Sequence, residues 1–215
     1  MEFTLWDILR NLMLAARWTL LLSVVAFAAG GVAGLAVLLA RVAARPWLRR
    51  PAELYIGAFQ GTPLLMQLFL VFFGLPLLGL RIEAWSAASV ALTLCASAFL
   101  AEIWRGGVEA IPRGQWEGAA SLGLHYVAQL RLIILPQAFS ITRAPTVGFL
   151  VQLVKSTALT SIIGFDELMR AANAINNATF APFTVYGFVA LIYFCICYPL
   201  TRYSRMLERS AARTR

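Results

Sequence analysis

The feature that most constrains this chain is a run of 23 residues, 18–40, that contains no charged side chain. As a helix the run extends about 35 Å, enough to cross the roughly 30 Å hydrocarbon core of a bilayer. Of all residues, 60% are hydrophobic and only 13% are charged, well below the roughly 25% typical of a soluble domain. The sequence therefore predicts an all-α, polytopic membrane protein whose residues 1–215 form a single transmembrane domain.

Four further apolar runs bring the predicted number of transmembrane helices to five. They lie at about residues 54–75, 84–103, 141–165 and 183–201. The first ten residues include the acidic Glu2 and Asp7, whereas a secretory signal carries basic residues in this region. We therefore expect the amino terminus to be retained. Apolar residues at helical spacing there predict a short interfacial helix; they are Phe3, Trp6, Leu9 and Met13.

The basic residues predict the orientation of these spans. Of the 18 Lys and Arg residues, 13 fall in or beside the segments that follow spans one, three and five, four fall in the opposite segments, and Lys155 lies within a span. Because cytoplasmic loops carry the excess of Lys and Arg, we expect the amino terminus outside and the carboxyl terminus in the cytoplasm. The net charge of +8 then reflects orientation and contact with anionic lipid rather than nucleic-acid binding.

A segment rich in polar and small residues, 105–138, separates the third and fourth spans and predicts an elbow of two short helices on the cytoplasmic side. We expect Gly106, Gly107, Pro112 and Gly114 to break the preceding helix. A new helix should open at Gln115 with Glu117 in its first turn, where the helix dipole favours a carboxylate, and end at Gly123.

The second helix of the elbow is predicted from about 125 to 135, with Pro136 kinking or stopping it. Just before the elbow, Glu102 and Arg105 are three residues apart, so we expect them to share a helix face and to be able to pair.

The elbow resembles the cytoplasmic loop of ABC transporter permeases, with its E-A-A, a glycine six residues after the Glu, and I-x-L-P. Its flanks, 101–107, 111–115 and 133–138, resemble the polar amino acid branch of that family. The resemblance implies that the loop docks into a separate ATPase and transmits ATP-driven motion. The coupling residues it implies are Glu117, Gly118, Ala119, Ala120, Gly123, Ile133, Leu135 and Pro136. An ordinary connecting loop with helix caps is the alternative.

The second predicted span contains a polar interruption. Residues 60–69 resemble the family segment R-G-T-P-L-x-x-Q-L-F, with Gln60 in place of the Arg. Pro63 removes a backbone donor, and Thr62 and Gln67 can satisfy the groups that are freed. Such helices often line a cavity, so Gln60, Thr62 and Gln67 are candidates for a substrate path; a tolerated kink in the bundle interior is the alternative.

The fourth predicted span has an unusually polar outer half that includes Lys155, the only lysine in the chain. A lysine inside an apolar segment is costly unless it is paired or faces water, so it marks a functional site by default. The candidate path residues here are Gln152, Lys155, Ser156 and Thr157. Pairing of Lys155 with Glu102, or extension of its ammonium to the outer surface, is the alternative.

This stretch is similar to the family pattern P-x-x-N-E-x-I-x-L-x-K-D-T-S-L, in which substrate contacts lie around K-D-T. Lys155, Thr157 and Leu159 match it; Gly148, Phe149, Ser156 and Ala158 depart from it. Relatives that handle cationic amino acids carry acids at the positions of Phe149 and Ser156. The resemblance therefore gives no support for a cationic cargo, whereas an ammonium suits a substrate carboxylate.

The residues needed for enzymatic chemistry are missing from the sequence. There is no P-loop, and His125 is the sole histidine, so neither a zinc-protease motif nor a Ser-His-Asp triad with a choice of histidines can be assembled. The cysteines, Cys95, Cys195 and Cys197, lie in apolar runs without metal-binding spacing. We expect no catalytic residue, no metal and no cofactor in this chain, with ATP and Mg bound by a partner ATPase.

Together the residues and the resemblance predict a membrane permease subunit of an ATP-driven importer for polar amino acids, located in the bacterial cytoplasmic membrane. Its expected partners are a cytoplasmic ABC ATPase, a second permease subunit, identical or paralogous, and an extracytoplasmic solute-binding protein. Two alternatives stay open. One is an ATP-independent secondary transporter or channel; the other is a structural or scaffold half without its own substrate site.

Overall fold

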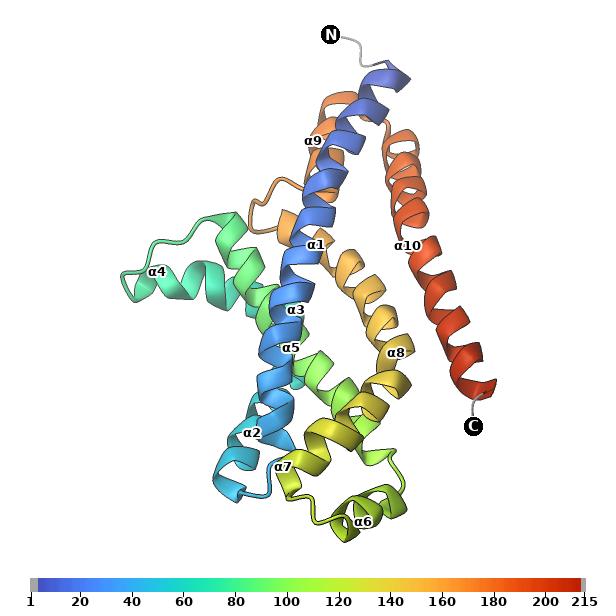
Figure 1. The fold of residues 1–215 in the computed structure, drawn as a ribbon. Helices are drawn as coiled ribbons and strands as arrows, with labels where there is room; N and C mark the ends of the chain where they lie inside the picture. Colours follow the sequence, from blue (N-terminus) through green and yellow to red (C-terminus); the bar gives the residue numbers. More distant parts are fainter. Residues whose placement is uncertain (1–3, 214–215) are drawn as a thin grey trace.

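The structure is a computed structural model that describes residues 4–213 of the chain, and within them it is entirely helical. The first helix, α1 (Leu5–Arg41), contains 37 residues and runs the length of the molecule (Figure 1). The expected interfacial helix and first span are thus one continuous helix, so the prediction of two separate elements was wrong. Thr4 caps it, accepting from the backbone N–H of Asp7, whose carboxylate in turn accepts from the N–H of Thr4.

The second predicted span is broken. Its parts are α2 (Pro46–Gly61), α3 (Leu64–Phe69), the π-helical turn η1 (Leu70–Gly74) and α4 (Leu75–Leu77). The two halves meet at 105° around Thr62 and Pro63, which have extended backbone conformations. The predicted interruption at Pro63 is thus a sharp break, because Pro63 cannot donate a backbone hydrogen bond and the helix restarts in a new direction. A single crossing at 54–75 stays a prediction.

Helix α5 (Ala84–Glu109) packs closely against α1. A Cβ atom at Gly30 would lie 2.6 Å from the Cβ of Ala96, and one at Gly34 would lie 2.9 Å from the carbonyl oxygen of Ser97. The small residues Gly30 and Gly34 allow the two helices to approach this closely. Helix α5 continues through Gly106 and Gly107 to Glu109, so these two glycines do not break it; it ends just before Pro112. The end of the third span at 103 stays a prediction.

The remaining elements complete the helical bundle (Figure 1). They are the elbow helices α6 (Arg113–Ser121) and α7 (Tyr126–Gln129), the π-helical turn η2 (Leu130–Ile134), α8 (Leu135–Ser156), the 3₁₀ turn η3 (Thr157–Ser161), α9 (Leu168–Thr179) and α10 (Pro182–Arg213). The helix α8, which contains most of the predicted fourth span, 141–165, begins earlier than that span, at Leu135, and ends at Ser156. The last helix extends past the predicted end at 201.

Three helices of the described residues are long and apolar enough to cross a membrane: Leu5–Arg41, Ala84–Glu109 and Pro182–Ser210. The bent pair, Pro46–Gly61 with Leu64–Leu77, makes up to four if it counts as one span. Helix α8 is not among them, and its sequence includes the polar residues that mark it as unusual. The predicted count of five spans stays a prediction.

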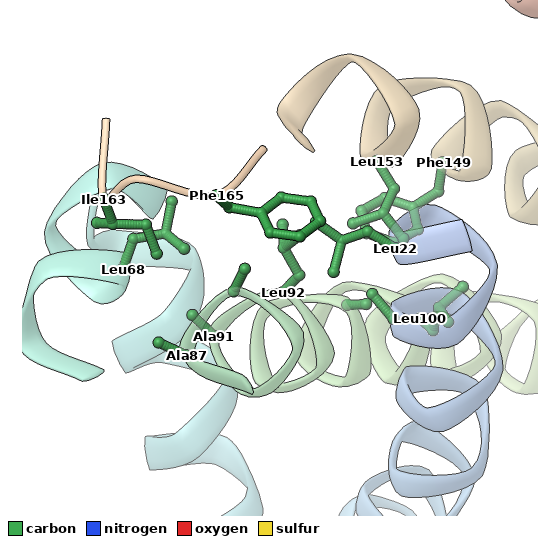
Figure 2. Packing of buried hydrophobic residues seen from close by; sticks show 13 residues of the cluster. Leu22, Leu68, Ala87, Ala91, Leu92, Leu100, Phe149, Leu153, Ile163 and Phe165 are labelled. Atoms are coloured by element: carbon green, nitrogen blue, oxygen red, sulfur yellow. The ribbon is translucent and has the colours of Figure 1, made fainter. Parts of the chain in front are cut away.

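The main hydrophobic core lies where α1, α5 and α8 meet (Figure 2). Leu92 of α5 is fully buried beside Phe165, while Leu22 of α1 lies near Phe149 and Leu153 of α8. Between membrane-spanning helices such contacts stabilise through close van der Waals packing rather than through removal from water. The core fixes α8, and with it the polar outer half of the predicted fourth span, against the rest of the molecule.

The two ends of the molecule differ. Helix α9 lies beside the first turns of α1 at one end, whereas α2, α6 and α7 lie at the other (Figure 1). The elbow is therefore remote from the segment that follows α8, and the long helices connect the two ends.

Candidate coupling elbow and transport cavity

The elbow begins where Pro112 caps α6, two residues earlier than predicted. As a result Glu117 lies beyond the first turn, and the expected placement of its carboxylate at the helix start was wrong. Glu117, Gly118 and Ala120 are exposed, while Ala119 is buried against the neighbouring helix. The exposed small residues leave one side of α6 open, and a Cβ at Gly118 would meet no atom within 4 Å.

Gly123 ends α6 as predicted. Its φ of +75° lies in the left-handed region, and its N–H donates to the carbonyl of Ala120 over 2.9 Å. The next N–H, of Leu124, donates to the carbonyl of Ala119 over 3.3 Å. These bonds satisfy the last carbonyls of the helix, and a side chain at position 123 would have to adopt a conformation that costs roughly 1–2 kcal/mol.

The first elbow helix is fastened to the second by aromatic stacking. The rings of Trp116 and Tyr126 are 6.0 Å apart between centroids and inclined by 17°. The hydroxyl of Tyr126 also donates to the carbonyl of Val42, 2.5 Å away, just beyond the end of α1. The elbow is thus held to both α7 and the end of α1 rather than hanging as a free loop.

The second elbow helix does not stop at Pro136. Helix α7, the turn η2 and α8 follow one another without a gap from Tyr126 to Ser156. Pro136 lies at the start of α8, directly after the wide π-helical turn, which accommodates the missing donor. Pro136 therefore does not stop the helix, and that part of the prediction was wrong; the elbow is joined directly to the predicted fourth span. In this segment Ile134 is fully buried, while Ile133 and Leu135 are partly buried around it.

Ion pairs brace the ends of three helices at the end of the molecule where the elbow lies. Arg105 binds Glu102, with Nε 2.9 Å from Oε2, and also pairs with Glu109 one turn later. The predicted pairing of Glu102 with Arg105 is confirmed. Arg41 of α1 pairs with Glu53 of α2 over 2.7 Å. Glu102 is therefore engaged within α5, and Lys155 makes no ion pair with any described residue.

Lys155 instead lines a cavity of about 770 Å³ between α8 and α10. The wall from α10 includes Tyr193, Phe194 and Tyr198, and its far end carries three arginines, Arg202, Arg205 and Arg209. None of the residues that line it is a carboxylate. The cavity can therefore hold an anionic or carboxylate-bearing group but offers no partner for a cation.

The other predicted path residues occupy different surroundings. Gln152 is exposed on the same helix as Lys155, Ser156 is partly exposed, and Thr157 is fully buried with its hydroxyl bonded to the carbonyl of Val154 over 2.7 Å. Gln60 is exposed on α2. The structure brings none of these four side chains into the lining of the Lys155 cavity.

Gln67 braces the break between α2 and α3. Its amide nitrogen donates to the carbonyl of Phe59 at 2.8 Å, and to both the carbonyl and the hydroxyl of Thr62, at 3.1 and 3.0 Å. Thr62 in turn donates to the carbonyl of Ala58. The prediction that Thr62 and Gln67 satisfy the backbone groups freed by Pro63 is confirmed.

Comparison with known proteins assigns the chain to a family. Residues 32–213 match the profile of a family described as binding-protein-dependent transport system inner membrane component. The chain belongs to this family. It is a multi-pass inner membrane permease subunit of an ABC transporter and not an enzyme; nucleotide binding in such transporters belongs to a separate ATPase.

Curated relatives of the permease carry similar names. It is 40% identical over 195 residues to the probable amino-acid ABC transporter permease protein YckA of Bacillus subtilis, covering 91% of this chain and 86% of the relative. It is 37% identical over 191 residues to the probable glutamine ABC transporter permease protein GlnM of the same organism, covering 89% and 88%.

Solved structures share the permease fold. A crystal structure described as an amino acid ABC transporter with histidines matches with a TM-score of 0.88 and 31% identity, over 98% of this chain and 100% of that one. The MetNI methionine ABC transporter in an inward-facing conformation matches with a TM-score of 0.74 and 22% identity, over 92% and 96%, a likeness that extends to the fold alone.

Glu167 is a buried residue of the permease that the sequence pattern does not single out. It precedes α9 and is 0% exposed, its Oε1 accepting from the N–H of Arg170 over 2.8 Å. Burial raises the pKa of Glu167 to about 7. One local signal in the sequence points to Glu167: it lies three residues before Arg170, the spacing at which a helix-capping side chain accepts from a backbone N–H.

Proposed function

We propose that the permease forms half of an ATP-driven import path for polar amino acids and is coupled to its ATPase through the α6 elbow. A second permease subunit, identical or paralogous, would complete the path, and an extracytoplasmic binding protein would deliver the solute. In this arrangement the amino terminus is outside and the elbow and carboxyl terminus are in the cytoplasm, as the distribution of arginines indicates.

The observation that carries the proposal is the continuous connection between the elbow and the cavity. Trp116 stacks on Tyr126, and from Tyr126 the chain is helical without interruption to Ser156, one residue beyond Lys155. A displacement of α6 is therefore transmitted along α8 to the ammonium in the cavity. The exposed side of α6, including Glu117, Gly118 and Ala120, is the surface we assign to the ATPase.

The wide turn η2 lies within this connection, next to the coupling residues Ile133, Leu135 and Pro136. Single π-helical turns occur frequently at functional sites. We assign these residues the role of holding the base of α8 against the hydrophobic cluster around Ile134, so that the helix moves as a unit.

The cavity supports a neutral or anionic amino acid as cargo. Lys155 lies in it without an ion-pair partner among the described residues, and the arginines at its far end add positive charge. Phe149, at a position where relatives handling cationic amino acids carry an acid, is buried and stacked on Phe99 with 5.4 Å between ring centroids. We assign the substrate carboxylate to Lys155. We also keep the other predicted residues of the path. They are Gln152, Ser156 and Thr157 near Lys155, and Gln60, Thr62 and Gln67 near the break between α2 and α3.

The coupling role is tested with the complete transporter in proteoliposomes, measuring ATP hydrolysis and uptake of radiolabelled glutamine together. We expect Gly123→Val and Glu117→Lys to lower uptake while ATP hydrolysis persists, because the first strains the end of α6 and the second reverses a charge on its exposed side. The control is Gly114→Ala, at an exposed glycine of α6 where a Cβ meets no atom within 4 Å. Normal coupled uptake by both test variants would defeat the assignment.

A further inference from the structure

Glu167 differs from the other charged residues that the structure describes, because none of them is buried to the same degree. The nearby guanidinium does not neutralise it: Arg170 directs its Nε to Asp166, with Oδ1 2.6 Å away. Among the described residues Glu167 therefore has no ion-pair partner. A buried carboxylate in this situation depends on hydrogen bonds, and a structure that keeps one without a cation invites a functional explanation.

The second carboxylate oxygen of Glu167 faces two other helices. Its Oε2 lies 3.4 Å from the hydroxyl of Thr19 on α1 and 3.5 Å from the hydroxyl of Tyr193 on α10. Thr19 also accepts from the N–H of Leu168 over 3.1 Å, which ties α1 to the first residue of α9. One side chain thus joins α1, α9 and α10, and the bonds from its Oε2 to the hydroxyls are long for hydrogen bonds.

This junction lies between two cavities. On one side a cavity of about 440 Å³ is bordered by Glu167 together with Arg17, Asp166 and Arg170, close to the end of the molecule where α9 lies beside α1 (Figure 1). On the other side Tyr193 borders the 770 Å³ cavity that contains Lys155. Glu167 borders one of these cavities and Tyr193 the other, so the contact between the two side chains lies where the two cavities approach each other.

We propose that Glu167, Thr19 and Tyr193 form an outer gate, in which the contact of Tyr193 with Glu167 closes the Lys155 cavity toward the outside and separates when α10 moves away from α9. The role rests on the proposed transport function, since a gate requires a path. Glu167 acts as a positioning residue: it is held rigidly on α9 by the backbone N–H of Arg170, while its other oxygen presents a contact that α10 can leave and regain without breaking the α9 helix.

The closing contact can be removed with little change in shape, because Tyr193→Phe deletes one hydroxyl and keeps the ring. Helix α10 offers a matched control. Tyr186 is also partly buried and its hydroxyl donates to Oδ1 of Asn173 on α9 over 2.9 Å, but Tyr186 does not line the Lys155 cavity. Tyr186→Phe therefore removes an α10–α9 hydrogen bond of the same kind away from the contact between Glu167 and Tyr193.

The assay measures access from outside to a reporter thiol placed beyond the gate. Thr201 lines the Lys155 cavity two turns further along α10, so Thr201→Cys, with the native Cys95, Cys195 and Cys197 replaced by alanine, provides the reporter. The complete transporter in right-side-out vesicles is treated with a membrane-impermeant anionic thiosulfonate. Inverted vesicles report access from the cytoplasmic side.

We expect Tyr193→Phe to accelerate labelling from outside by about two-fold or more, the factor that corresponds to loss of a weak hydrogen bond of about 0.5 kcal/mol. Labelling in inverted vesicles and in the Tyr186→Phe control should stay at the rate of the parent. Equal labelling rates from outside for Tyr193→Phe and Tyr186→Phe would overturn the gate. The gate would also be overturned if the reporter in Tyr193→Phe were not labelled from outside although inverted vesicles show that its thiol is reactive.

Failure of the gate is distinguishable from failure of the transport function. Co-purification of the ATPase and ATP-dependent uptake are measured on the same preparations. If both are intact and the outside rate is unchanged by Tyr193→Phe, the gate is wrong and the transporter stands. If the parent shows neither ATPase nor uptake, the path on which the gate depends is itself refuted.

Discussion

Gly107 of α5 packs closely against α8, near the point where both helices lead into the elbow. A Cβ atom there would lie 2.9 Å from the carbonyl oxygen of Ala138 and would collide with the methyl group of Thr142. Its neighbour Gly106 is exposed, and a Cβ there meets no atom within 4 Å. Gly107→Ala should therefore force α5 and α8 apart, whereas Gly106→Ala should not.

The difference between the two variants can be estimated from the contacts. Adding a methyl group to a closely packed site costs about 1–3 kcal/mol. Alanine in a helix interior also stabilises by up to about 1 kcal/mol relative to glycine, a gain both variants share. The free energy of unfolding of Gly107→Ala should thus lie about 1–3 kcal/mol below that of Gly106→Ala. At roughly 2–4 °C per kcal/mol, the midpoint of thermal unfolding should differ by about 2–12 °C.

The assay is thermal unfolding of the detergent-purified transporter, followed as loss of the monodisperse peak in size-exclusion chromatography. Because Gly107 lies beside the elbow, Gly107→Ala should also lower uptake per ATP hydrolysed. Equal midpoints for Gly106→Ala and Gly107→Ala would refute the inferred close packing of α5 against α8.

Three further predictions follow from the site. Gln67→Leu leaves the backbone at the α2–α3 break without its donor and should lower the free energy of unfolding by about 1–3 kcal/mol, measured in the same melts; an unchanged midpoint would refute the bracing role. Lys155→Met should reduce glutamine uptake at least ten-fold while the ATPase still co-purifies, and Lys155→Arg should restore part of it; normal uptake by Lys155→Met would exclude Lys155 from the path. The raised pKa of Glu167, about 7 against an ordinary 4.5, means that its contribution to stability is full below pH 4.5 and is lost as the pH rises through 7, by roughly 3 kcal/mol. The midpoint of the parent should therefore fall over this pH range more than that of Glu167→Gln, and parallel curves would contradict the burial of this carboxyl group.

Local features of the fold could be predicted from sequence because their causes are local. Gly123 ends α6 since the left-handed conformation at a helix end favours glycine, and Glu102 pairs with Arg105 because residues three apart share a helix face. The role of Thr62 and Gln67 followed from the missing donor of Pro63, five or fewer residues away.

Features that depend on distant contacts were not predictable in the same way. Gly107 was expected to break a helix, but α8 packs against it and the small residue serves that contact. Pro136 was expected to end a helix, but the preceding wide turn η2 accommodates it. The angle of 105° between Pro46–Gly61 and Leu64–Leu77 was not predicted, because Pro63 explains why the helix is interrupted but not the direction in which it restarts.

The candidate site shows the same division. Lys155 was recognised because a lysine in an apolar segment is unusual in itself. The burial of Glu167 was not predicted, because the hydroxyls that face it come from Thr19 and Tyr193, 148 and 26 residues away in the chain. The cavity wall formed by α10 likewise depends on how α10 packs against α8, which no periodic pattern specifies.

The central claim, that this permease works with a separate ATPase through its elbow, is tested most directly by affinity purification of the tagged chain from a mild detergent with identification of the bound proteins. The account predicts that an ABC ATPase co-purifies with the parent and is reduced by Glu117→Lys. Recovery of no ATPase from the parent, when crosslinking before extraction shows that complexes survive the detergent, would contradict it.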